Sequence, residues 1–167
     1  MDLKEAKSKF VHAWGALGSN WGINRTMAQI HALLMVSDES LTTEDIMDYL
    51  GVSRGNANMN LRALIEWGLI HRELKQGERK EYFIAERVSF QIAKKIIIER
   101  RKREIEPIKN VLTELKQIDK GATGKPEKAF VKTIHDIEDL VLKMDRLADK
   151  VSRADENWFL NALLKVQ

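Results

Sequence analysis

The spacing of apolar residues changes at Gly68, and this change constrains the fold more than any other feature of the sequence. Residues 54–67 place apolar side chains three and four positions apart, which is typical of a helix that buries one face. Residues 69–74 and 81–84 flank a polar stretch at 75–80 and have the shorter period of strands, which predicts a β-hairpin. Because two strands alone are only marginally stable in water, the hairpin must pack against the helices before it.

Two helices with recognisable ends precede the hairpin. Thr42 and Ser53 suit the N-cap position, because a short hydroxyl side chain accepts a hydrogen bond from a free backbone N–H of the first turn. Gly51 interrupts the first helix after Leu50, and Gly68 suits the left-handed position that ends the second. The sequence therefore predicts a short helix up to about residue 50, a three-residue turn, and a helix over 54–67.

Helical spacing also predicts helices on either side of this region. One lies in residues 3–17, where Gly18-Ser19-Asn20 should end it, and another spans residues 26–36. The pattern is helical again from about Arg87 to Lys120, with Pro107 either at a kink or in the first turn of a new helix. Residues 121–126 have the composition of a linker.

Beyond the linker, apolar residues recur at alternating spacings of four and three, the seam of a coiled coil or helix bundle. This seam consists of Phe130, Ile134, Ile137, Val141, Met144, Ala148 and Val151. Leu140 and Leu147 widen the stripe, which favours a bundle of several helices. A small module cannot cover all these apolar faces, so we expect a dimer. Its expected interface residues are Phe10, Trp14, Ile105, Ile108, Leu112, Ile134, Ile137, Val141 and Met144.

The distribution of charge indicates the kind of partner. The whole chain has 28 Lys and Arg against 25 Asp and Glu, but residues 54–103 hold 13 basic residues against 6 acidic ones. An anionic partner is therefore suggested for this segment, either nucleic acid or another anionic surface. The alternative is a solvated helix face, and the basic run at 100–103 by itself supports nothing stronger.

Several classes of protein are excluded or disfavoured. Without Cys, the chain has no disulfides, thiolate metal sites or Cys nucleophiles. His135 has only Glu138 as a neighbouring ligand on its helix, and two groups do not make a metal site, so we expect no metal and no cofactor. No Ser-His-Asp order, phosphate-binding loop or dinucleotide-binding glycine pattern occurs, so we expect no enzyme. The charged N-terminus and the lack of long apolar runs indicate a cytoplasmic protein without membrane contact.

The second capped helix offers a face suited to the major groove of DNA. Residues Ser53 and Arg54 lie at the positive end of the helix dipole and suit phosphates. We expect Asn56, Met59, Asn60 and Arg62 to point away from the core. The two Asn amides can bond adenine, Met59 can contact thymine methyl groups, and Arg62 adds a cation. The alternative is an ordinary surface helix capped by Ser.

The hairpin that follows completes a recognisable module. A helix-turn-helix followed by a β-wing reads DNA, with the second helix in the major groove and the wing tip at the adjacent minor groove or backbone. Arg79 at the tip is the expected minor-groove probe, and Lys75 and Lys80 are expected phosphate contacts. A solvated turn residue is the alternative for Arg79.

At this point the sequence resembles a known family. The similarity lies in four segments: Leu50-Gly51-Val52-Ser53-Arg54-Gly55-Asn56, Asn60-Leu61-Arg62-Ala63-Leu64, Trp67-Gly68-Leu69-Ile70 and Gly77-Glu78-Arg79-Lys80-Glu81-Tyr82-Phe83. They are similar to the GbsR-like branch of the MarR superfamily of winged-helix transcriptional regulators, over roughly residues 8–118. The resemblance implies a homodimer with interlocking terminal helices that covers two major grooves of an imperfect palindrome.

The resemblance also raises the question of an effector. Some regulators of this branch are associated with choline and glycine betaine metabolism. A cage of Trp14, Trp21, Trp67 and Trp158 around a quaternary ammonium group is one hypothesis, and core or interface roles for these residues are the other. Control by a small-molecule effector is a hypothesis, and the sequence does not identify the molecule.

The predicted fold is mainly α, a winged helix-turn-helix with a small β-hairpin wing flanked by N- and C-terminal dimerisation helices. Residues 1–21 form the N-terminal dimerisation helix, 22–86 the DNA-binding region, and 87–167 the C-terminal helical dimerisation region with its linker at 121–126. The predicted function is a sequence-specific DNA-binding transcriptional regulator that acts as a homodimer on a palindromic operator. The alternative is a winged-helix module for protein–protein interaction without specific DNA binding.

Overall fold

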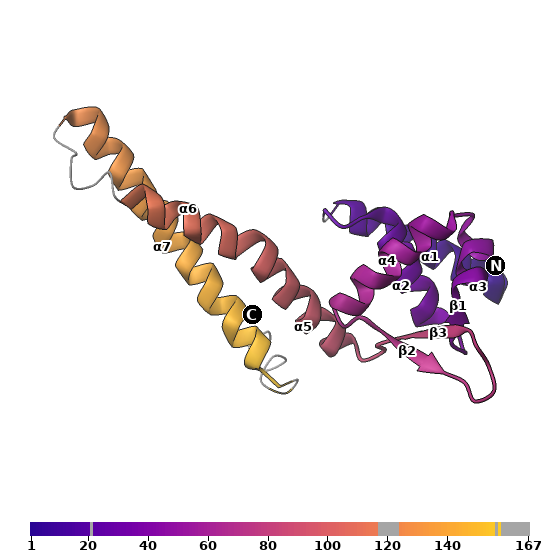
Figure 1. Cartoon of the computed structure of the whole chain (residues 1–167). Coiled ribbons are helices and arrows are strands. Elements are labelled where there is room, and N and C mark those ends of the chain that lie inside the picture. Colours follow the sequence, from indigo (N-terminus) through magenta and orange to yellow (C-terminus); the bar gives the residue numbers. More distant parts are fainter. Residues whose placement is uncertain (21, 117–123, 156, 158–167) are drawn as a thin grey trace. The chain divides into compact units, whose positions relative to one another are not determined.

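The computed structural model describes residues 1–20, 22–116, 124–155 and 157 (Figure 1). It is mainly helical with one small antiparallel sheet, as predicted, and it divides into two compact units, Met1–Ile92 and Ala93–Gln167. The first unit contains α1 (Leu3–Asn20), α2 (Arg25–Val36), β1 (Leu41–Thr42), α3 (Thr43–Leu50), α4 (Arg54–Glu66), β2 (Ile70–Leu74), β3 (Glu81–Ala85) and the start of α5 (Ser89–Arg100).

Helices α1 and α2 approach each other closely at two glycines. Gly15 and Gly18 are buried, and a Cβ at Gly18 would lie only 2.5 Å from the Cβ of Ala28. The predicted end of the first helix at Gly18 is therefore wrong, since α1 continues to Asn20. These glycines make room for the neighbouring helix instead of ending their own.

The helix ends predicted for the helix-turn-helix are confirmed. The Thr42 hydroxyl accepts from the backbone N–H of Asp45 at 3.2 Å, and the Asp45 carboxylate accepts from the backbone N–H of Thr42 at 2.8 Å. Ser53 Oγ accepts from the backbone N–H of Asn56 at 3.3 Å. Gly51 and Gly68 have φ values of 64° and 68°, the left-handed backbone that glycine adopts without a steric penalty. Together these residues fix the turn between α3 and α4 and the exit into the wing.

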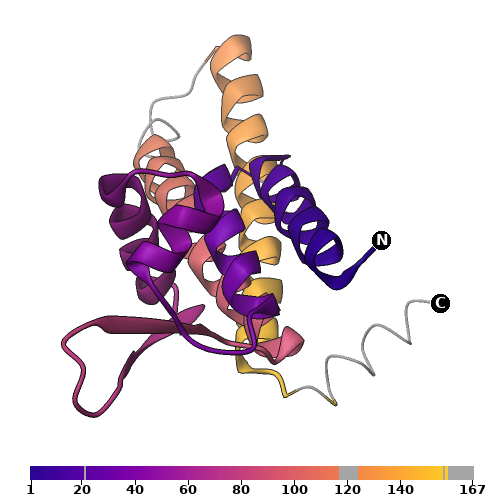
Figure 2. The same ribbon diagram turned by 90° about the vertical axis from the view of Figure 1, so that its right-hand side faces the viewer.

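The predicted hairpin is confirmed, but the sheet has a third strand that the sequence analysis missed. Its strand order is β1-β3-β2, with Leu41 paired to Phe83 and Thr42 to Tyr82. A two-residue strand shows no alternation, which is why it went unrecognised. The hairpin projects from the helices of the first unit (Figures 1 and 2), and its root is anchored because Ile70 and Phe83 are buried.

The core of the first unit lies among the helices and the root of the wing. Its largest fully buried side chains are Val11, Ile30, Leu34, Ile46, Leu61, Leu64 and Ile70. They come from α1, α2, α3, α4 and β2, so all five elements share one core. This core holds α4 and the base of the wing in fixed places while leaving one face of α4 in solvent.

The second unit is a helical hairpin. It contains the rest of α5, a π-helical turn η1 (Arg101–Ile105), α6 (Glu106–Leu115) and α7 (Lys125–Arg153), and α6 lies alongside α7 (Figure 1). Pro107 lies in the first turn of α6, which decides between the two predicted roles. The backbone N–H of Glu106 donates to the carbonyl of Arg101, five residues back, so a wider turn precedes the proline.

Two predictions for this unit need correction. Residues 121–123 of the predicted linker lie outside the described residues, but Lys125 and Pro126 belong to α7, where a proline is tolerated in the first turn. The predicted seam is not buried as a whole. Ile134 is only 9% exposed, whereas Ile137 and Met144 are 41% and 52% exposed. The reason is that α7 turns a different face, which includes Asp145, toward its partner helix.

Asp145 joins the two arms of this hairpin through ion pairs. Its carboxylate accepts from Arg101 Nε at 2.6 Å and from Lys109 Nζ at 2.8 Å, and the residue is only 8% exposed. Hydrogen bonds from Arg101 and then from Lys109 lower the pKa of Asp145 to about 2. A polar cluster therefore replaces apolar packing at this point of the unit, which helical periodicity did not reveal.

Candidate nucleic-acid interface

The exposed face of α4 begins at its N-terminus. Gly55, Met59, Arg62 and Glu66 are exposed and recur at spacings of four and three, so they form one stripe along the helix. Met59 is 59% exposed although its side chain is apolar. This stripe contains two of the predicted base-contacting residues, Met59 and Arg62.

Asn60 does not lie where the sequence analysis placed it. It is 3% exposed, so the expectation that its side chain is exposed is wrong. On a helical wheel Asn60 lies about 40° from Leu64, one of the fully buried leucines, rather than opposite it. Its Nδ2 donates to the backbone carbonyl of Asn56 at 2.8 Å and to Asn56 Oδ1 at 2.6 Å. Asn56 itself is half-buried at the edge of the exposed stripe.

A charged pair stands at the start of α4. Arg54 lies 2.8 Å from the Glu44 carboxylate of α3, and both side chains are well exposed. The pKa of Glu44 is lowered by its own backbone N–H and by Arg54. Arg54, a predicted phosphate contact, therefore already has an anionic neighbour. The Ser53 side chain beside it is the N-cap of α4.

The wing carries the predicted cations at its tip. Arg79 and Lys80 are exposed, and Lys75 Nζ lies 4.1 Å from the centre of the Tyr82 ring. Gly77 turns the chain with φ 82°, and the Tyr82 hydroxyl donates to Glu78 across the loop. The tip is therefore a shaped loop and not an extended tail.

Electrostatics connects the wing to the helix-turn-helix. Lys80 contributes to lowering the pKa of both Glu44 and Asp45, and Lys75 contributes at Asp45. Because Glu44 also binds Arg54, the start of α3 lies close to cations from both α4 and the wing. The structure thus gathers Arg54, Lys75 and Lys80 in one region.

The predicted interface residues fall into two groups. Leu112 and Ile134, at 3% and 9% exposed, are buried within the second unit and have little surface left for a partner. Phe10, Ile108, Ile137 and Met144 are exposed, while Trp14, Ile105 and Val141 are half-buried. Val111, which is 48% exposed, was not among the predicted interface residues. Leu140 and Leu147, which are 59% and 62% exposed, were predicted only to widen the seam.

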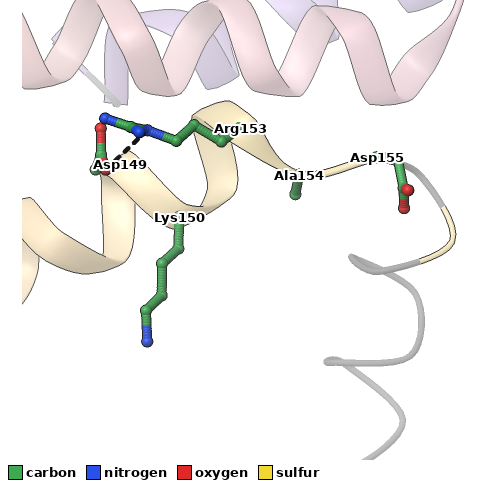
Figure 3. A pocket seen from close by; sticks show the side chains of 5 residues that line it. All are labelled: Asp149, Lys150, Arg153, Ala154 and Asp155. Atoms are coloured by element: carbon green, nitrogen blue, oxygen red, sulfur yellow. Dashed lines mark ion pairs between the residues drawn. The ribbon is translucent and has the colours of Figure 1, made fainter.

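The predicted tryptophan cage finds no support among the described residues. Trp67 is 8% exposed, and Trp14 packs on Phe10 with ring centres 5.5 Å apart, whereas Trp21 and Trp158 lie outside the described residues. Figure 3 shows a pocket of about 440 Å³ at the end of α7, where Lys150 points away from the 3.0 Å ion pair of Arg153 with Asp149. The five described residues that line this pocket include no aromatic side chain.

The described part of the chain contains no cluster of three His, Asp or Glu side chains arranged to hold a metal ion. None of its helices combines the length and the apolar character that crossing a bilayer requires.

Comparisons with known proteins agree with this arrangement. Residues 21–81 match the model of the MarR family. A solved structure described as a transcriptional regulator has the same fold, with a TM-score of 0.65 and 21% identity over 89% of this chain and 97% of that one. No curated protein matches the chain. Neither finding names the GbsR-like branch, which stays a prediction; residues 21–81 are similar to the MarR family, and the chain carries a winged helix-turn-helix fold of that type.

Proposed function

We propose that this protein is a transcriptional regulator that binds specific DNA sequences as a homodimer on a palindromic site. The observation that carries the proposal is the exposed stripe of α4, which is flanked by the cations of Arg54 and of the wing in a domain of the MarR type. A helix presented in this way fits the major groove, while the wing fits the adjacent backbone or minor groove.

The chemistry of the stripe favours contact with base edges. Met59 offers apolar contact to a thymine methyl group, and Arg62 offers paired donors to guanine or to a phosphate. Asn56 lies at the edge of the stripe, as does Asn58, a half-buried residue that the sequence analysis did not single out. Arg54, Lys75 and Lys80 supply contacts to phosphate, and Arg79 remains the proposed minor-groove probe.

The homodimer is supported by apolar side chains left in solvent on the second unit. They lie on both arms of the helical hairpin and are Ile108, Val111, Ile137, Leu140, Met144 and Leu147. A second copy of the chain would cover this surface and would place two α4 helices on one duplex, which is how a symmetric dimer recognises a palindrome.

The test is a binding selection on randomised duplexes, followed by affinity measurements at several salt concentrations. The selected sequence should be palindromic, and affinity should fall steeply with salt because phosphate contacts release counterions. Arg62→Ala should weaken binding, whereas Lys143→Ala, which removes an exposed cation from the second unit, should not. If the wild type selects no sequence and shows no salt-dependent binding, the domain is a protein–protein module instead.

A further inference from the structure

The buried amide of Asn60 is unusual for a helix that faces DNA. Asn60 is 3% exposed and lies beside Leu61 and Leu64 in the inner face of α4, yet its side chain is polar. Burying an amide is unfavourable unless it is hydrogen-bonded. The Nδ2 group of Asn60 donates twice to one residue, Asn56, at 2.8 Å to the carbonyl and at 2.6 Å to Oδ1.

The second of these bonds joins two side chains that lie one turn apart on α4. A side-chain bond to the carbonyl four residues earlier is common within helices, and it uses one of the two Nδ2 hydrogens of Asn60. The bond to Asn56 Oδ1 instead restrains another side chain. Because Asn60 is fixed by its burial, Asn56 Oδ1 is held toward the core side of α4, and the Nδ2 end of the same amide is left for solvent or a ligand.

We propose that Asn60 is a positioning residue that orients Asn56, so that Asn56 presents hydrogen-bond donors to the major groove. This inference rests on the proposed function. A freely rotating Asn bonds adenine with one donor and one acceptor. With Oδ1 already engaged, the side chain of Asn56 favours a base edge rich in acceptors, such as N7 and O6 of guanine.

The test compares the base preferences of the wild type, Asn56→Ala, Asn60→Ala and the double variant by selection on randomised duplexes. Asn60→Ala should lose base preference at the same base pair as Asn56→Ala. Its affinity for the selected site should fall on the order of fivefold, while its affinity for random DNA should stay the same. The double variant should be no worse than Asn56→Ala alone. The matched control is Asn58→Ala, which should leave that base pair unaffected.

A second measurement does not depend on the folding of an Asn60 variant. In the wild type, the side-chain amide protons of Asn60 should exchange slowly with water in NMR spectra, and Asn56→Ala should accelerate their exchange.

The outcomes separate the two proposals. A wild type without sequence preference overturns the proposed function and this inference together. A selective wild type overturns this inference alone in three cases: when Asn60→Ala keeps the preference that Asn56→Ala loses, when Asn56→Ala itself changes no base preference, or when the Asn60 amide exchanges fast.

Discussion

Gly55 is a residue whose presence packing does not explain. It lies in the first turn of α4 on the exposed stripe, and a Cβ there would meet no atom within 4 Å. Glycine disfavours a helix relative to alanine by up to about 1 kcal/mol. The helix therefore carries a residue of low helix propensity at a position where alanine would fit. In the proposed complex with DNA, close approach of the α4 backbone to the duplex would account for glycine at this position.

We predict that Gly55→Ala raises the free energy of unfolding by about 0.5–1 kcal/mol and weakens specific DNA binding about tenfold. The added methyl group stabilises the helix but meets the base edges in the complex. Denaturant titration and anisotropy on the selected duplex measure the two effects. An alanine variant that binds as tightly as the wild type would show that this turn of α4 does not approach DNA closely.

In the proposed complex, DNA would have to compete with Glu44 for the Arg54 guanidinium. A phosphate that binds Arg54 must displace or share the carboxylate that lies 2.8 Å away. We predict that Glu44→Gln strengthens binding to specific and random duplexes alike by about two- to threefold at low salt, with a smaller gain at high salt. Glu39→Gln, the same charge change at another exposed position of the first unit, is the control. Weaker binding by the Glu44 variant would mean that Glu44 positions Arg54 for DNA.

His31 makes the stability of the first unit sensitive to acid. It is 3% exposed, its Nε2 has no hydrogen-bond partner in the structure, and burial lowers its pKa from 6.5 to about 4. The unfolded chain therefore takes up a proton at a higher pH than the folded chain. The stability that neutral His31 allows is fully present above pH 6.5 and is lost as the pH falls from 6.5 toward 4.

We predict a loss of up to roughly 3 kcal/mol of stability across this interval, measured by denaturant unfolding at several pH values. His31→Leu should remove this part of the pH dependence while keeping an apolar side chain of similar size in the core. If the variant and the wild type lose stability in parallel between pH 6.5 and 4.5, His31 is not the group responsible.

At the scale of the elements, the sequence predicts what depends on local rules. Thr42, Ser53 and Gly68 mark helix ends through short-range chemistry, and the hairpin follows from a change of period, so these features were predictable. The third strand depends on a partner forty residues away. The burial of Asn60 depends on how α4 rotates against α2, because residues on the flank of a helix are assigned to core or solvent only by the packed structure.

The same reasoning applies to the second unit. Its helices were predictable from periodicity, but the side of α7 that meets α6 is set partly by Asp145. An acidic residue on a helix is ordinarily read as solvent-facing. The face of α7 that packs against α6 is therefore rotated about the helix axis relative to the predicted seam. Met144 lies in solvent and its neighbour Asp145 is buried.

We predict that Asp145→Ala lowers the stability of the second unit by about 1–3 kcal/mol, because it leaves the Arg101 and Lys109 cations without their shared carboxylate. Thermal melting followed by circular dichroism of the full chain measures this loss. Asp139→Ala is the control, since its carboxylate is 76% exposed and lies 4.0 Å from Lys143. Equal, small effects for both variants would show that the cluster contributes nothing beyond surface charge.

At the scale of the whole molecule, the excess of basic residues in 54–103 has two different uses. Within 100–103, Arg100 pairs with Glu104, Arg101 with Asp145, and Lys102 with Glu99. The pair of Arg101 with Asp145 joins the two arms of the second unit, whereas the other two pairs lie within one helical segment. The charge that remains for a nucleic acid comes chiefly from α4 and the wing, and the basic run that looked most prominent in the sequence contributes less than its composition suggests.

We predict that the protein is a dimer of about twice 19.2 kDa by light scattering, and that Leu140→Glu or Leu147→Glu converts it to a monomer. Both leucines are mostly exposed on α7, so a charge there should disrupt a partner contact without disturbing the fold. Arg146→Glu, a charge change at an exposed position on another face of the same helix, should leave the mass unchanged. A wild type that scatters as a monomer at micromolar concentration contradicts the prediction.

Thr42 belongs to β1 and is also the N-cap of α3, so one residue serves the sheet and the helix at once. No linker residue separates these two elements. A residue inserted next to Thr42 would break either its pairing with Tyr82 or its bond with Asp45. The loop at 75–80 lies between strand ends that are already paired and leads into no helix. Relatives of different length should therefore differ in the number of residues at the wing tip. The number of residues between β1 and α3 should be the same in all of them.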